Sequence, residues 1–193
     1  MKMKLQTVTL GCSKNKVDTE HILSQVEGLY EIIPEGEDIP VDVLLLNTCG
    51  FIGDAKEESI QAVLEAVDRK ARGEVGKVIV FGCLSQRYGH EIPDLIPEVD
   101  AWFGAREFDP VIRALGVEPD RSKDAERYLT TPSHYAYLKI SEGCDRRCSY
   151  CAIPFIRGAH KSVPMEKLVE EASNLAQQGV KELIIIAQDT TYY

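Results

Sequence analysis

Three short apolar runs in the first part of the chain each end close to a cysteine, and this recurrence constrains the fold more than any other feature. The runs span residues 5–10, 41–46 and 77–81, and the cysteines that follow them are Cys12, Cys49 and Cys83. Apolar runs of this length are typical of strands in parallel sheets, which are covered on both faces. Stretches with helical spacing of apolar residues separate them, so the chain alternates strand and helix.

This alternation predicts an α/β fold with a doubly wound parallel sheet for residues 1–115. We expect helices at 17–29, with Ser13 as the N-cap, at 54–72 and at 110–115, and a further strand at 101–103. In the second helix, Ile60, Val63, Leu64 and Val67 should form the buried face.

A second unit should begin after residue 134. Residues 116–134 are charged, contain proline and have no clear period, which is typical of a linker. Residues 135–193 then give a strand at 135–140, a cysteine loop, a helix at 165–178 closed by Gly179, and a strand at 183–187. That order predicts the beginning of a parallel barrel. The predicted buried face of its helix comprises Leu168, Val169, Ala172, Leu175 and Ala176.

The cysteines of the first unit are expected to meet in space. In doubly wound sheets, ligands bind outside the carboxyl ends of the strands, and neighbouring strands lie about 4.8 Å apart. Cys12, Cys49 and Cys83 could therefore reach one cofactor. The alternative is that each is a buried structural cysteine, which is the commoner role for a single one.

The other three cysteines are closely spaced as Cys144-x-x-x-Cys148-x-x-Cys151. Three thiolates from one loop leave an iron of a [4Fe–4S] cluster without a protein ligand. The alternative is structural zinc, which takes four protein ligands. His160 is the candidate fourth ligand, but its distance from Cys151 exceeds the usual tight spacing.

Composition narrows the partners and the compartment. The net charge is −9, from 22 basic and 31 acidic residues, which disfavours general binding of nucleic acid and suits a basic protein or a small molecule. The longest apolar runs are too short to span a bilayer, and the first residues lack a secretory signal. We therefore expect a cytoplasmic protein, in which reduced cysteines serve metals or catalysis.

Residues 143–151 (GCDRRCSYC) resemble the signature of the radical S-adenosylmethionine (SAM) proteins. The resemblance implies that Cys144, Cys148 and Cys151 hold a [4Fe–4S] cluster whose open iron binds SAM. It also implies that SAM is cleaved reductively to a 5′-deoxyadenosyl radical and that Tyr150 borders the adenine. The position directly after a strand is where barrel active sites lie.

Residues 10–15 (LGCSKN), 47–52 (NTCGFI), 55–60 (AKEESI) and 82–84 (GCL) are similar to the methylthiotransferase family, and most to its branch that modifies ribosomal protein S12. Residues 153–154, 157–158 and 188–191 fit the same family. The resemblance implies that Cys12, Cys49 and Cys83 bind an auxiliary [4Fe–4S] cluster that carries the sulfur to be inserted. The reaction would place a methylthio group on the β-carbon of an aspartate of S12, within the 30S ribosome or before assembly. Flavodoxin or ferredoxin would supply electrons.

The sequence also leaves other functions of the protein open. The same chemistry on a tRNA adenosine is the nearest alternative, and a non-enzymatic iron–sulfur carrier is an alternative of another class. Compared with the family, the chain stops after two predicted barrel strands, so we expect these 193 residues to be inactive on their own. Lys14 and Asn15 fit either a contact with the cluster region or a solvent-facing helix start, and most histidines are expected to face solvent or to be satisfied locally.

Overall fold

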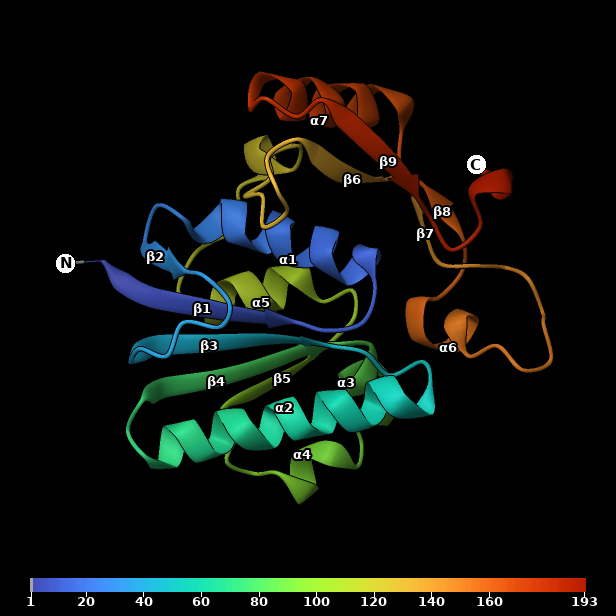
Figure 1. Ribbon diagram of the computed structural model, residues 1–193. Helices are drawn as coiled ribbons and strands as arrows, with labels where there is room; N and C mark the ends of the chain where they lie inside the picture. The colour runs from blue at the N-terminus through green and yellow to red at the C-terminus, as the bar shows by residue number, and fades with distance from the viewer. Residues whose placement is uncertain (1) are drawn as a thin grey trace.

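The computed structural model describes residues 2–193 and contains one five-stranded, fully parallel sheet (Figure 1). The strand order is β2-β1-β3-β4-β5. The strands are β1 (Met3–Thr9), β2 (Tyr30–Ile33), β3 (Val41–Thr48), β4 (Val75–Gly82) and β5 (Ala101–Gly104). The central strand β3 is covered on both sides, because Leu44 and Leu46 belong to one hydrophobic core while Val43 and Leu45 belong to the other.

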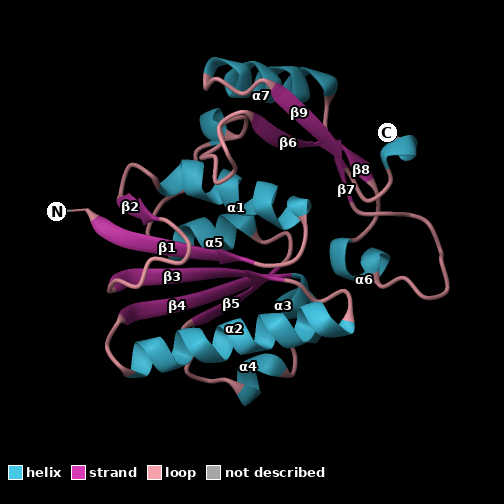
Figure 2. Ribbon diagram, in the orientation of Figure 1, coloured by secondary structure: helices cyan, strands magenta, loops and turns pink. Residues whose placement is uncertain are grey.

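Helices cover both faces of this sheet, as Figure 2 shows. One face packs against α1 (Ser13–Val26) and α5 (Phe108–Ala114). The other face packs against α2 (Gly53–Ala71), α3 (Cys83–Tyr88) and α4 (Ile92–Leu95). The predicted α/β fold with a doubly wound parallel sheet is confirmed.

Several local expectations for the first unit were wrong. Ser13 is the first residue of α1 rather than its N-cap, and the helix ends at Val26, so Leu29 lies beyond it and is exposed. In α2 the buried residues are Ser59, Val63 and Ala66, whereas Ile60 and Leu64 are exposed. Small side chains let α2 lie close to the sheet, which turns the neighbouring larger residues outward. The edge strand β2, and the short helices α3 and α4, were not predicted.

The second unit has the predicted strand–helix–strand order. Strands β6 (Tyr135–Lys139) and β9 (Glu182–Ile186) pair in parallel, and α7 (Met165–Gln177) packs on them through Leu175. Between them lie a two-stranded antiparallel sheet, β7 (Ser141–Glu142) with β8 (Lys161–Ser162), and the short helix α6 (Ile153–Arg157). The predicted buried face of α7 is only partly correct, because Val169 and Ala176 are exposed.

Residues 116–134 contain only one short 3₁₀ helix, η1 (Arg121–Lys123), but they pack against the rest of the protein. Arg127 is only 4% exposed, and the Tyr128 amide donates to the Glu20 carbonyl oxygen over 3.1 Å. This segment therefore packs along α1 and joins the two units. A second 3₁₀ helix, η2 (Thr190–Tyr192), follows β9.

Within residues 2–193, no helix has the length and apolar character that crossing a bilayer requires.

Candidate functional site

The structure brings Cys12, Cys49 and Cys83 together at the carboxyl edge of the sheet. Cys12 follows β1, Cys49 follows β3 and Cys83 begins the helix after β4, and these three strands are neighbours. All three cysteines line one cavity of about 850 Å³. The two buried thiols belong to Cys49 and Cys83, while Cys12 is exposed.

The backbone before Cys12 is shaped for this close approach. Gly11 has φ +87°, which other L-residues rarely adopt. A Cβ atom at this position would lie 2.6 Å from Cβ of Cys49 and 2.9 Å from its Sγ. The turn after β1 can therefore lie against Cys49 only because residue 11 is a glycine.

Asn15 contacts this group of thiols from the first turn of α1. It is fully buried, and its Oδ1 lies 3.9 Å from Sγ of both Cys12 and Cys83. Its Nδ2 donates to the carbonyl oxygens of Leu10 and Thr48. Of the two sequence-based interpretations of Asn15, the contact with the cysteines is the one that the structure supports.

Burial and nearby groups shift the pKa of the Cys83 thiol in opposite directions. Burial raises the pKa of the Cys83 thiol above its ordinary value. The Arg157 guanidinium lowers this pKa, whereas the thiols of Cys49 and Cys12 raise it further. Three thiolates crowded together need a cation or a metal to stabilise them.

The second group of cysteines lies on the loop between β7 and α6. Cys144 is buried, Cys148 is exposed and Cys151 is partly buried. They line a cavity of about 400 Å³ together with Gln188 and other residues after β9. Tyr150 is 89% exposed and is not among the residues that line this cavity, so its role beside the adenine stays a prediction.

The two cysteine groups face adjoining spaces. Cys151, Ile153 and Gln188 line both the cavity of Cys12, Cys49 and Cys83 and the cavity of the loop cysteines. Molecules held in the two cavities would therefore be near neighbours.

A buried cluster of charges joins the two units beside these cavities. Arg157 of α6 donates to Asp18 of α1 over 2.7 Å and to Glu142 over 3.3 Å, and it also pairs with Oδ1 of Asn15. Lys139 of β6 contacts the same two carboxylates. Gln188 donates to Glu142 over 2.5 Å.

The thiols fit iron–sulfur clusters better than a single metal ion. Among residues 2–193, no three His, Cys, Asp or Glu side chains are grouped as ligands of one ion. In a [4Fe–4S] cluster each thiolate binds a different iron, so the thiolates surround a larger group. His160, the candidate fourth zinc ligand, lines neither cysteine cavity, and its Nε2 contacts the Ser162 hydroxyl over 3.1 Å.

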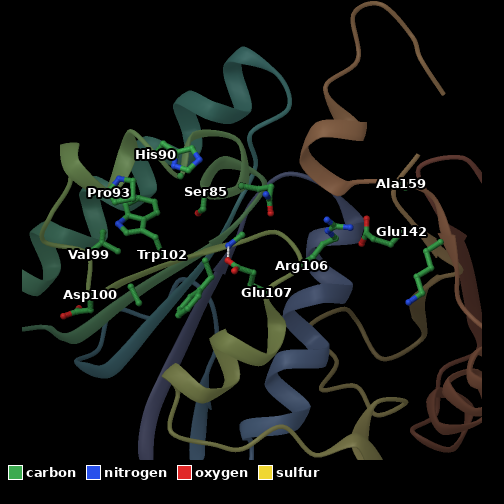
Figure 3. A pocket seen from close by; sticks show the side chains of 16 residues that line it. Ser85, His90, Pro93, Val99, Asp100, Trp102, Arg106, Glu107, Glu142 and Ala159 are labelled. Carbon is green, nitrogen blue, oxygen red and sulfur yellow. Dashed lines mark hydrogen bonds between the residues drawn. The ribbon is translucent and has the colours of Figure 1, made fainter. Parts of the chain in front are cut away.

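A larger cavity of about 1050 Å³ lies along β5, beside α3 and α4 (Figure 3). Its lining includes Trp102, Arg106 and Glu107, and no cysteine. Glu142 lines it from the second unit and links this wall to the charged cluster. This cavity is therefore distinct from the two cavities that the cysteines line.

Sequence reasoning did not assign roles to Asp18, Lys139, Glu142 or Arg157. Their partners lie up to 142 positions away along the chain, and no local spacing indicates such pairs. The only available signal was that residues 157–158 and 188–191 fit the methylthiotransferase family.

The fold and the two cysteine groups define an α/β protein with a radical SAM segment. Residues 138–193 match the family model described as Radical SAM superfamily. Residues 4–104 match the family described as Uncharacterized protein family UPF0004, and the chain belongs to this family.

Curated relatives agree with the resemblance seen in the motifs. The chain is 50% identical over 193 residues to the Ribosomal protein uS12 methylthiotransferase RimO of Cytophaga hutchinsonii, covering all of this chain and 44% of the relative. Proteins of the same name from Christiangramia forsetii and Bacteroides thetaiotaomicron are 50% and 49% identical, over 100% and 98% of this chain and 42% and 44% of the relatives. The chain thus spans less than half the length of these relatives, and it is similar to their methylthiotransferase family throughout.

Two solved structures of low sequence identity share the fold. The radical SAM methyltransferase TsrM of Kitasatospora setae, with tryptophan and a SAM analogue bound, superimposes with a TM-score of 0.63 at 11% identity, over 97% of this chain and 48% of that one. The cobalamin-dependent SAM radical enzyme OxsB gives a TM-score of 0.55 at 14% identity, over 92% and 32%. At these identities the likeness concerns the arrangement of strands and helices.

Proposed function

We propose that the whole protein is a radical SAM methylthiotransferase that modifies an aspartate of ribosomal protein S12. The observation that carries this proposal is the pair of adjoining cavities, each lined by one group of three cysteines. Cys151, Ile153 and Gln188 line both cavities. A methylthio transfer needs a sulfur source and a radical source close together, and this arrangement supplies a place for each.

The roles divide between the two groups. Cys144, Cys148 and Cys151 would hold a [4Fe–4S] cluster with SAM, and Cys12, Cys49 and Cys83 would hold a second [4Fe–4S] cluster. When bound, the first cluster and SAM supply a 5′-deoxyadenosyl radical, and the second supplies the sulfur. The chain's own part is to hold the two groups of thiols at adjoining cavities and to keep water from the buried thiols Cys49, Cys83 and Cys144.

S12 as the substrate is supported by the names of the curated relatives and by the charge of the chain. With a net charge of −9, the chain attracts a basic ribosomal protein and repels phosphate, a steering effect that weakens as salt rises. We further propose that the protein works in the cytoplasm, on S12 alone or within the 30S ribosome, with flavodoxin or ferredoxin as electron donor.

The test is to delete the gene and to measure the mass of S12 and the modified nucleosides of tRNA. Loss of a methylthio group from S12 with tRNA unchanged supports the proposal, and restoring the gene should return the mass. Intact S12 together with loss of a methylthio-adenosine from tRNA would move the protein to the tRNA branch. Failure of the purified, reconstituted protein to produce 5′-deoxyadenosine from SAM would favour a carrier of iron–sulfur clusters.

A further inference from the structure

Arg157 is the one charged side chain of the buried cluster that lines the cavity of Cys12, Cys49 and Cys83. Its partners Asp18 and Glu142, and the second cation Lys139, line a different cavity. Arg157 itself is 2% exposed and comes from α6 of the second unit. The second unit therefore places a fixed positive charge in the wall of a site built by the first.

Asn15 connects this guanidinium to the thiols. Its Oδ1 pairs with Arg157 and lies 3.9 Å from the sulfurs of Cys12 and Cys83. Asp18, one helical turn along α1, holds the other side of the guanidinium. Two α1 residues thus fix the orientation of Arg157 toward the cysteines.

We propose that Arg157 is a positioning residue for the cluster of Cys12, Cys49 and Cys83, and that its charge stabilises the more reduced, more negative form of that cluster. A guanidinium is always protonated in proteins, so its charge is permanent. Charge–charge interactions are strong in a buried site of low dielectric, and two carboxylates and an amide hold the cation there. The inference rests on the proposed function, because it takes these cysteines to be cluster ligands.

Arg127 provides a matched comparison within the same molecule. It is also buried, it pairs with Glu20 of α1, and it donates to Glu171 of α7 over 2.6 Å. Like Arg157, it therefore joins a carboxylate of the first unit to one of the second. Unlike Arg157, it lines neither cysteine cavity.

The experiment measures the reduction potential of the Cys12, Cys49 and Cys83 cluster by titration followed with electron paramagnetic resonance. The background is the whole protein with Cys144, Cys148 and Cys151 replaced by Ala, which isolates this cluster. Into it we introduce Arg157→Gln, Arg157→Lys or Arg127→Gln. Iron content is measured in parallel after anaerobic reconstitution.

We expect Arg157→Gln to shift the potential to more negative values, Arg157→Lys to restore most of the shift, and Arg127→Gln to leave the potential unchanged. Loss of iron in Arg157→Gln but not in Arg127→Gln would also support the proposal, since both substitutions remove a link between the units. Equal potentials in the background protein, Arg157→Gln and Arg157→Lys would overturn it, as would an equal loss of iron in Arg157→Gln and Arg127→Gln. If the background protein itself binds no iron, the cluster assignment fails, which is a result distinct from equal potentials.

Discussion

The two groups of cysteines are built in opposite ways. Cys12, Cys49 and Cys83 are far apart in the sequence and are gathered by three neighbouring parallel strands. Cys144, Cys148 and Cys151 come from one loop and have only short elements around them. The first arrangement exists only when the sheet is formed, whereas the second needs little more than the local chain. The difference predicts that the first group depends on backbone packing and the second on its own spacing.

Removing either group of thiols should have the largest effect. Replacing Cys144, Cys148 and Cys151 with Ala should leave about half of the iron, roughly four of eight per chain after anaerobic reconstitution. Replacing Cys12, Cys49 and Cys83 should leave the other half. Iron and sulfide analysis measures both. Full loss in either triple variant would show that the groups are not independent.

A single backbone change should distinguish the two arrangements. Gly11→Ala would place a Cβ atom 2.6 Å from Cβ of Cys49 at φ +87°, so we expect loss of the iron at the strand ends and retention of the iron at the loop. Gly179→Ala is the control, because Gly179 also has positive φ (+98°) but no atom lies within 4 Å of its added Cβ. The control should cost only about 1–2 kcal/mol of backbone strain. Equal iron loss in the two variants would argue for general destabilisation.

Thiol reactivity without metal should sharpen the comparison. In the apoprotein, exposed Cys148 should react with iodoacetamide at least about tenfold faster than Cys83, which is buried and whose pKa is raised by burial. Exposed Cys12 should resemble Cys148, so that the strand-end group contains one fast and two slow thiols. Peptide mass spectrometry over a time course measures each rate. Uniformly fast reaction of Cys12, Cys49 and Cys83 would contradict a preformed sheet edge.

The smallest expected effect concerns the junction between the two regions. Burial, Arg127 and Lys139 lower the pKa of His21 from 6.5 to about 3. Below pH 6.5, His21 therefore binds a proton in the unfolded chain but stays neutral in the folded chain. The stabilising contribution is complete above pH 6.5 and is lost as the pH falls toward 3, by up to about 1.4 kcal/mol per pH unit.

Replacing His21 with Gln should remove this part of the pH dependence. Urea unfolding of the wild-type protein and His21→Gln at pH 7, 6 and 5 measures it, and other titrating groups cancel in the difference. Parallel pH profiles for the two proteins would contradict a His21 whose pKa is lowered in the folded chain.

The sequence was sufficient for the features that depend on local pattern. Strands β3 and β4 are apolar on both faces, and each cysteine lies at a strand end, so the meeting of Cys12, Cys49 and Cys83 follows from sheet geometry alone. Prediction from the sequence was wrong where the packing of one element against another decides which side chains are buried. Ile60 and Leu64 fit a helical stripe, yet the smaller Ser59 and Ala66 make the contact because they allow α2 to approach the sheet closely.

The charged junction was beyond sequence reasoning for a related reason. Glu20, Arg127 and Glu171 look like exposed charges in a list of residues, and only the packing of the second unit on α1 buries them as partners. His21 likewise gains its neighbour Glu171, 3.6 Å away, from the second unit. Position along a single helix cannot reveal which of its polar residues will be covered by a later part of the chain.

The polar outer face of α1 has a consequence for the chain while it is being made. Asp18 and Glu20 find Arg157 and Arg127 only 139 and 107 residues later. At about 5–20 residues per second, the ribosome leaves this face uncovered for on the order of ten seconds. An apolar helix face exposed during this time would attract other nascent chains, whereas a face that carries carboxylates stays hydrated. The carboxylates of α1 therefore suit a surface that is made before the segment that covers it.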